Sequence, residues 1–276
     1  MKTLTKKDLK IPKRSTKSHK GDNGKVLVIG GSRDYVGAVA LAGLAALRTG
    51  VDWVTVAVPE KVGWAINALT PDLVVKKYKG DDFCASRAKD VLKLAKGFDA
   101  VLIGNGIGMH AKSFCKAFLS KINKPCVIDA DAIKAVNIDM INNCILTPHE
   151  KELNIFLKNS KLNKINKIKN QNKKINEIRK IIKNNIILLK GPVDTIISKN
   201  KVAKNKTGNP GMTKAGTGDV LAGLCVGFLG QGLDLFQAAC NAAYINGVLG
   251  DLHLKKKKGY TYLASDLLED IKEVLK

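Results

Sequence analysis

A Gly-rich segment that ends in a carboxylate is the part of the sequence best suited to chemistry. Residues 207–219 read TGNPGMTKAGTGD and lead directly into the apolar run Val220–Leu224. Small residues at 216–218 let backbone N–H groups approach an oxyanion, and the start of a helix adds its positive end. The sequence therefore predicts an anion cradle with Asp219 inside it.

Asp219 has two interpretations on this segment alone. A carboxylate beside a bound polyphosphate is unfavourable unless it has a task, such as taking the proton from an attacking hydroxyl. An acidic residue in the first turn of a helix also favours the helix dipole, by about 0.3–1 kcal/mol. The composition of the segment leaves both a general base and a helix-stabilising residue open.

Familiar nucleotide-binding fingerprints do not describe this segment. The GxxxxGK[ST] pattern of a Walker A loop is missing. A GxGxG run at Gly104–Gly108 follows an apolar stretch, but no acidic residue with clear strand context stands at the ribose-binding distance of a Rossmann turn. Neither fingerprint therefore identifies the nucleotide or its contacts.

The elements that must position these residues alternate from about residue 25 onward. We expect strands at 25–30, 53–58, 100–104, 125–130, 144–147, 186–190 and 194–198. Helical spacing occurs at 36–49, 83–96, 109–121, 149–158, 219–230 and 235–251, with a Lys/Asn-rich surface helix within 158–185. Nearly continuous apolar strands separated by helices predict an α/β fold, doubly wound, with a mostly parallel sheet and helices on both faces.

No internal repeat or Ser/Gly linker interrupts this series. We therefore expect residues 1–276 to form a single domain, with residues 1–20 as a basic N-terminal segment. Ligands of such sheets bind beyond the carboxyl ends of the strands. Those ends carry Gly30–Ser32, Gly104–Gly108, Asp129–Asp131, Thr147–His149 and Lys190–Gly191, which are the places to look for a site.

Five motifs, in this order, resemble those of the NAD(P)H-hydrate dehydratases, ribokinase-like enzymes that return hydrated NADH and NADPH to the native cofactors. They are GA at 37–38 before LAGLAALRTG at 41–50, the Gly104–Gly108 turn, DADA at 129–132, TPHEKE at 147–152, and GNPGM at 208–212 with GTGD at 216–219. The resemblance covers about residues 20–275. It implies a ribokinase-like fold.

The resemblance also implies a reaction. ADP or ATP, with Mg²⁺ bridging its phosphates, phosphorylates the hydroxyl of the hydrated ring, and phosphate is then eliminated to restore the double bond. By the family pattern Asp219 would be the base on that hydroxyl. Ala38, Gly106 and His149 would contact the hydrated dinucleotide. The residues that would hold the nucleotide are Lys190, Gly191, Pro192, Val193, Asp194, Thr217 and Gly218.

Several assignments keep an alternative. Glu152 resembles the Mg²⁺-organising glutamate of related kinases, yet it and His149 also fit helix capping. Asp131 either holds the hydrated ring or orders its loop. The usual proline of a GPG turn is Asn105 here, an exchange we expect to be harmless. The family threonine after Lys-Gly falls on Asp194 or Thr195, which leaves that nucleotide contact open.

The nearest rival function is a ribokinase-like kinase for a hydroxymethylpyrimidine, a thiazole or a sugar. Such a kinase would use the same Asp219 and the same cradle, but it would release a phosphorylated product. Some relatives carry a fused epimerase domain that this sequence lacks, so an epimerase partner would be a separate chain. Apolar helices at 36–49 and 235–251 offer interface material for a homo-oligomer.

The formal net charge of +23 suggests nucleic acid or an anionic membrane as another partner class. Residues 1–20 hold eight basic residues and one acid, and residues 158–183 hold ten basic residues and one acid. Neither stretch contains an RNP-type sequence, zinc-ligand spacing or an Arg-rich arm. We therefore expect no nucleic-acid partner, and a solvated helix that exposes Lys164, Lys167, Lys173 and Lys174.

Cysteine spacing and the N-terminal residues favour a cytoplasmic protein. No two of the six cysteines are close enough for a CxxC motif, and several lie in apolar runs, so we expect reduced, buried thiols. The first residues lack the apolar core of a signal peptide. The longest apolar stretch, at 38–47, is far shorter than a membrane span, so no membrane partner is expected.

Overall fold

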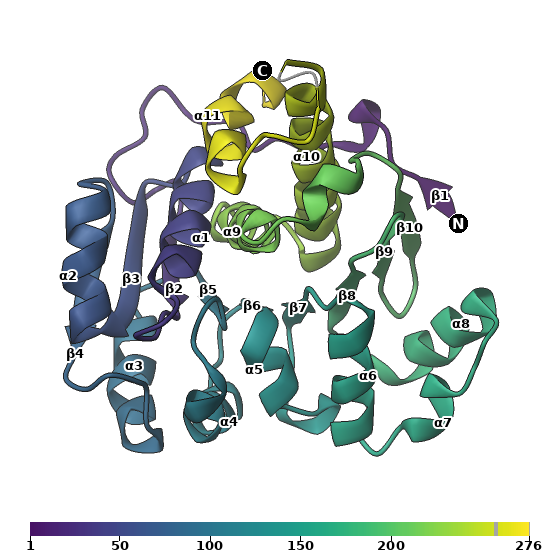
Figure 1. Cartoon of the computed structure of the whole chain (residues 1–276), viewed down its shortest axis with the longest axis horizontal. Helices are drawn as coiled ribbons and strands as arrows, with labels where there is room; N and C mark the ends of the chain where they lie inside the picture. Colours follow the sequence, from purple (N-terminus) through teal and green to yellow (C-terminus); the bar gives the residue numbers. More distant parts are fainter. Residues whose placement is uncertain (257–258, 276) are drawn as a thin grey trace.

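Ten strands join in one sheet in the computed structural model, which describes residues 1–256 and 259–275 (Figure 1). The sheet order is β1-β10-β9-β8-β7-β6-β5-β2-β3-β4. The strands are β1 (Lys2–Thr3), β2 (Lys25–Ile29), β3 (Trp53–Pro59), β4 (Val74–Tyr78), β5 (Ala100–Ile103), β6 (Cys126–Ile128), β7 (Cys144–Leu146), β8 (Ile186–Leu189), β9 (Asp194–Ile197) and β10 (Val202–Asn205). From β4 to β8 along this order all pairings are parallel, whereas β9 is antiparallel to both neighbours.

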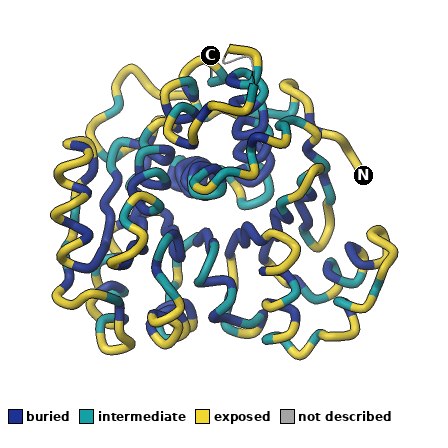
Figure 2. The backbone as a smooth tube through the Cα atoms, viewed as in Figure 1, coloured by how far each residue is buried: buried dark blue, intermediate teal, exposed yellow. Residues whose placement is uncertain are grey.

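Helices cover the sheet on both faces because the central strands are apolar on both sides; all four residues of β5, for example, are buried (Figure 2). One face carries α1 (Val36–Arg48), α2 (Glu60–Leu69), α9 (Thr217–Gly230), α10 (Leu235–Lys256) and α11 (Ala264–Val274). The other carries α3 (Ala88–Ala95), α4 (Lys112–Leu119), α5 (Ala130–Ala135), α6 (Glu150–Asn159), α7 (Asn163–Asn166) and α8 (Gln171–Ile181). The predicted doubly wound α/β fold with a mostly parallel sheet is confirmed.

The two Gly/Ala-rich helices α1 and α9 pack backbone against backbone. A Cβ placed on Gly223 would lie 2.2 Å from the carbonyl oxygen of Ala42, and one on Gly227 would lie 2.3 Å from Thr49 Oγ1. Larger residues would push the helices apart, so small residues determine how α9 crosses the sheet. This packing brings the start of α9, with Asp219, to the carboxyl ends of the strands.

Several elements lie where the sequence analysis placed none. The edge strand β4 has the pattern VVKKY, in which lysines replace the apolar run of a central strand, as is common at protected sheet edges. The short strands β1 and β10 form the opposite edge, so part of the basic N-terminal segment is ordered and Leu4 is buried. Helices α2, α5 and α11 also lie outside the expected helices.

The surface helix expected within 158–185 is two helices, α7 and α8. Their isoleucines pack inward, with Ile165, Ile175 and Ile178 buried, as the spacing predicted. Lys174 was wrongly placed on the exposed face: it is 5% exposed, and its amine forms an ion pair with Glu150 of α6. An isoleucine pattern alone does not show where a neighbouring helix lies.

None of the helices in residues 1–256 and 259–275 is both long and apolar enough to span a bilayer. All six cysteines are free thiols. Five are buried, as expected. Cys84 is exposed, so the expectation of a buried thiol is wrong there, because it lies in the polar segment 81–86 rather than in an apolar run.

Candidate active site

The anion cradle begins at Gly216, which precedes α9 in the left-handed backbone region with φ +95°. A Cβ there would lie 2.7 Å from Ala264 Cβ and 2.9 Å from Leu41 Cδ1, so the position requires glycine for space as well as for conformation. The Thr217 hydroxyl donates to the carbonyl oxygens of Met212 and Lys214 and so holds the preceding loop. The Thr217 N–H donates to the Lys214 carbonyl at 3.4 Å, whereas the next N–H groups of α9 lack acceptors within the helix and are available to an anion.

Lys190 brings a cation to this helix start. It directly follows β8, and its N–H donates to the Pro148 carbonyl, which ties the ends of two neighbouring strands together. A Cβ on Gly218 would lie 3.5 Å from Lys190 Nζ. Burial opposes the charge, but Asp129, Glu152 and Asp219 together raise the pKa of Lys190, so it stays protonated.

A cavity of about 660 Å³ opens in front of the cradle. Its lining includes six of the predicted nucleotide residues: Lys190, Gly191, Pro192, Asp194, Thr217 and Gly218. Val193 is not among the lining residues and is 39% exposed. The opposite wall comes from residues 207–214 and from Asn246 and Gly247 of α10.

Asp194, unlike Thr195, lines this cavity. Its carboxylate accepts hydrogen bonds from the Gly191 N–H at 3.1 Å and from Asn205 Nδ2 at 3.2 Å. Burial raises the pKa of Asp194, and these two hydrogen bonds oppose the rise. Of the two positions left open by the sequence, the cavity geometry therefore favours Asp194.

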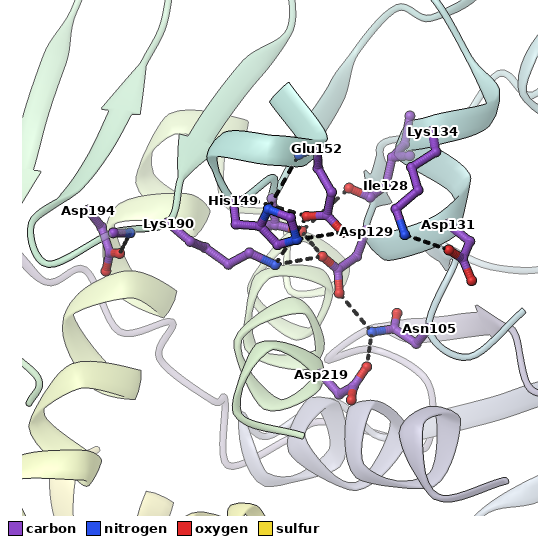
Figure 3. A network of polar contacts seen from close by, with 12 residues as sticks. Asn105, Ile128, Asp129, Asp131, Lys134, His149, Glu152, Lys190, Asp194 and Asp219 are labelled. Carbon is purple, nitrogen blue, oxygen red and sulfur yellow. Dashed lines mark hydrogen bonds and ion pairs between the residues drawn. The ribbon is translucent and has the colours of Figure 1, made fainter. Parts of the chain in front are cut away.

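Asp219 belongs to a buried polar network at the strand ends (Figure 3). Asn105 Nδ2 lies 2.6 Å from Asp219 Oδ1 and 2.9 Å from Asp129 Oδ2. The other oxygen of Asp129 accepts from Thr147 Oγ1 at 2.7 Å and from Lys190 Nζ at 3.2 Å. The network connects the catalytic candidate to the nucleotide cavity through Asp129.

The surroundings of Asp219 suit a proton acceptor. Burial raises its pKa to about 7, Asp129 adds to the rise, and the Asn105 hydrogen bond and the Lys190 charge oppose it. A base with a pKa near the working pH combines a usable ionised fraction with strong proton affinity. A purely helix-stabilising aspartate would gain from staying ionised, whereas burial here disfavours the ionised form.

Two of the predicted substrate residues lie together next to this network. A Cβ on Gly106 would lie 3.1 Å from Ala38 Cβ, so the Gly104–Gly108 turn packs against the start of α1. Gly106 follows Asn105 directly. Ala38 and Gly106 therefore lie next to Asn105, which contacts Asp219, whereas His149 lines the cavity together with Lys190.

His149 and Glu152 form the cap of α6. The Glu152 N–H donates to His149 Nδ1 at 3.3 Å, and the His149 N–H donates to Glu152 Oε2 at 3.0 Å. The same carboxylate oxygen lies 3.9 Å from Lys190 Nζ. Asp131 forms an ion pair with Lys134 at 2.8 Å, so its carboxylate is engaged within its own helix. The capping interpretation describes both His149 and Glu152 in this structure.

Three residues of the network were named within sequence motifs but given no role there: Asn105, Asp129 and Thr147. Their side chains are nearly or fully buried, with residue exposures of 0%, 2% and 0%. All three stand just after strands, so the strand-end rule pointed to them. Composition alone could not separate the inward-facing Asp129 from its neighbour Asp131.

Known proteins with similar sequences share one description. A family model described as NAD(P)H-hydrate dehydratase matches residues 26–273. A bifunctional NAD(P)H-hydrate repair enzyme from Methanocaldococcus jannaschii is 43% identical over 275 residues, covering 98% of this chain and 52% of the relative. This chain spans about half the length of the first curated relatives that it matches. An ADP-dependent (S)-NAD(P)H-hydrate dehydratase from Cenarchaeum symbiosum is 34% identical, covering 96% of this chain and 93% of the relative.

Solved structures agree with the fold. The ADP/ATP-dependent NAD(P)H-hydrate dehydratase from Bacillus subtilis, co-crystallised with ATP and Mg²⁺, superposes with a TM-score of 0.81 at 27% identity, covering 99% of this chain and 97% of that chain. A ribokinase from Arabidopsis thaliana superposes with a TM-score of 0.57 at 12% identity, covering 92% of this chain and 99% of that chain. The fold is therefore ribokinase-like, as the motifs implied.

Proposed function

Because this chain belongs to the NAD(P)H-hydrate dehydratase family, we propose that it repairs hydrated NADH and NADPH with ADP or ATP as co-substrate. The position of Asp219 carries the proposal. Its carboxylate stands in the first turn of α9, where it adjoins the cradle and shares a network with Lys190. A base beside a phosphate-binding helix start is what phosphoryl transfer to a hydroxyl requires.

In the first step Asp219 takes the proton from the ring hydroxyl of the hydrated cofactor. The hydroxyl oxygen then attacks the terminal phosphoryl group, and the nucleotide leaves with one phosphate fewer. Negative charge shifts to the leaving oxygens, and the helix start and Lys190 stabilise it from fixed positions. The hydrated ring would enter beside Ala38 and Gly106, which pack together next to Asn105, the hydrogen-bond partner of Asp219.

In the second step the phosphorylated ring loses phosphate. The C–O electron pair leaves with the phosphate, and a proton leaves the neighbouring ring carbon, so the double bond returns. Phosphate is a far better leaving group than hydroxide, which explains why a nucleotide is consumed. The cradle that held the transferred phosphoryl group is placed to stabilise the departing phosphate.

The nucleotide would occupy the cavity lined by Lys190, Gly191, Pro192, Asp194, Thr217 and Gly218. Its phosphates would point to the start of α9, and the apolar surface of Met212 and Leu221 would face the adenine base of the nucleotide. His149 lines the same cavity, which supports a contact near the nucleotide as well as the predicted contact with the hydrated dinucleotide. The ADP-dependent name of the Cenarchaeum symbiosum relative supports ADP as one co-substrate.

Magnesium belongs to this proposal as an ion carried by the nucleotide phosphates. Within the described part of the chain, no three His, Cys, Asp or Glu side chains come together as a metal site. Glu152 directs its carboxylate to its own helix cap and to Lys190, so it does not fit as a free ligand. Mg²⁺ commonly binds substrate phosphates with few protein ligands, and no step above depends on it.

The wider setting is also part of the proposal. The ten strands of the described residues share one sheet, which supports residues 1–276 as one domain. Free thiols are typical of reducing compartments, which supports a cytoplasmic location. The bifunctional names of relatives support a second repair activity working beside this one, and the family resemblance suggests that this second activity is an epimerase. A homo-oligomer built through apolar helix surfaces stays a prediction.

One incubation tests the function against its nearest rival. The protein is mixed with hydrated NADH and either ADP or ATP, and the absorbance of the reduced nicotinamide is followed together with free phosphate. A dehydratase restores the absorbance and releases one phosphate for each ring repaired. A kinase for a pyrimidine, a thiazole or a sugar would leave the hydrated NADH unrepaired, with no gain in absorbance and no free phosphate, and that result would refute the proposal.

A further inference from the structure

Asn105 has no part in the steps above, although its side chain is fully buried beside the proposed base. Its Nδ2 contacts both Asp219 and Asp129, and its Oδ1 is buried without a hydrogen-bond partner. Buried polar atoms are normally paired, so an orphaned amide oxygen calls for an explanation. An explanation is that the amide nitrogen is needed where it contacts the two carboxylates.

We propose that Asn105 is a positioning residue that holds the Asp219 carboxylate in place and keeps it available as a proton acceptor. The inference rests on the proposed function, because it concerns the same base. It gives Asn105 a role in the reaction, whereas the sequence had led us to expect the exchange of proline for Asn105 to be harmless.

The backbone around Asn105 leaves its side chain little freedom. It lies between Gly104 with φ +128° and Gly106 with φ +65°, both in the region that favours glycine. A Cβ on Gly104 would lie 1.9 Å from the Asp129 carbonyl oxygen, and one on Gly30 would lie 2.2 Å from the Asn105 carbonyl oxygen. The turn therefore packs tightly between the ends of β2 and β6, and the backbone of Asn105 is held in one position.

The hydrogen-bond partners of Asn105 determine the orientation of its amide. With Nδ2 toward the two carboxylates, both of its hydrogens meet acceptors; the reverse orientation would place a carbonyl oxygen against two negative groups. Asp129 is itself held by Thr147 and Lys190. Asn105 therefore connects a fixed carboxylate to the one that must be aimed at the substrate, as Figure 3 shows.

The charged groups around Asp219 show what this amide contributes. The negative charge of Asp129 disfavours ionisation of Asp219, and the positive charge of Lys190 favours it. Lys190, however, pairs directly with Asp129 and lies near Glu152. Asn105 is the side chain that donates to Asp219 in the described residues. Hydrogen bonding to the ionised form lowers a pKa, so losing this donor raises the pKa of Asp219 further.

The test compares Asn105→Ala with Asn185→Ala. Asn185 is also a buried amide, but it holds backbone groups near residues 141, 144 and 182. Both variants lose buried hydrogen bonds, and only the first changes the surroundings of Asp219. The rate of ADP-dependent dehydration is measured from pH 5.5 to pH 9 for each variant and for the wild type.

We expect the acid limb of the Asn105→Ala profile to move to higher pH. A base that is more easily protonated loses most activity at low pH, so the loss at pH 6 should exceed the loss at pH 9 by about threefold or more. The Asn185→Ala profile should keep its shape. An equal loss at every pH, or an unchanged profile, would overturn the inference.

A second readout does not depend on activity. Infrared titration of the protonated carboxyl band, assigned by its absence in Asp219→Asn, follows the proton on Asp219 directly. Asn105→Ala should raise the midpoint of this titration, and an unmoved midpoint would refute the inference. If the wild type shows no dehydration at all, the proposed function fails while this titration still decides the role of Asn105. Should Asn105→Ala not fold, Asn105→Leu, which has a similar size and no donor, serves in both measurements.

Discussion

Lys190 Nζ would lie 3.5 Å from a Cβ on Gly218, so the lysine amine and the bare glycine backbone share the space in front of α9. The cation comes from the end of β8, and the N–H groups come from the first turn of a helix nearly thirty residues later. Their meeting forms the proposed phosphate site, which neither element could provide alone.

Replacing Gly218 by valine should abolish this site. Micromolar affinity corresponds to about 8 kcal/mol, and a helix start contributes at most about 2 kcal/mol, so the glycine turn, Lys190 and the cavity wall must act together. Gly218→Val should weaken ADP binding at least about tenfold in calorimetry, because the branched side chain fills the phosphate position. Gly218→Ala places a Cβ in ordinary contact and should weaken it less. Unchanged ADP affinity in a folded Gly218→Val protein would refute the cradle.

Lys190→Met should lower both stability and nucleotide affinity. Asp129 is 2% exposed, and removing its ion-pair partner leaves a buried negative charge, which costs about 3 kcal/mol. Adding Asp129→Asn removes that charge and should restore most of the unfolding free energy. The double variant should still bind ADP weakly, since the phosphate cation is gone. If ADP affinity returns together with stability, Lys190 acts only as a partner of Asp129.

Asp219 should make the fold less stable as the pH rises. Its pKa in the folded chain is about 7, well above the ordinary 3.8, so the folded state holds a proton that the unfolded state releases. Stability therefore falls between about pH 4 and pH 7. Asp219→Asn lacks this effect, so its melting temperature should exceed that of the wild type by a margin that grows from pH 4 to pH 8. A margin independent of pH would contradict the buried, proton-binding carboxylate.

The exposed lysines within residues 158–183 should be dispensable for catalysis, whereas the buried Lys174 contributes to stability. Lys164, Lys167 and Lys173 are exposed, and replacing all three by glutamine should leave turnover within about twofold because solvent and salt screen such charges. Lys174→Gln should instead reduce stability, since this lysine is buried and paired with Glu150. A loss of turnover above tenfold in the triple variant would show that surface charge takes part in function.

The strand-end rule explains why much of the site could be predicted. Lys190, Gly106 and the residues after β6 come together because the carboxyl ends of parallel strands meet at one edge. The contact between Asn105 and Asp219 could not be predicted, because it depends on how α1 and α9 approach each other across many small residues. The sequence left helix capping and a functional role open for His149 and Glu152, and only the structure shows that the two cap α6 together. Nothing in the sequence showed that Lys174 would be buried and paired with Glu150.

The most direct test of the account is Asp219→Asn, measured for both ADP binding and dehydration of hydrated NADH. The variant keeps the shape and loses the negative charge and the basicity. A positioned base contributes about 10²–10⁴-fold in rate, so turnover should fall at least about a hundredfold. ADP affinity should hold or rise slightly, because a carboxylate facing phosphates repels them. Near-normal turnover with only a change in stability would contradict the central claim that Asp219 is the general base.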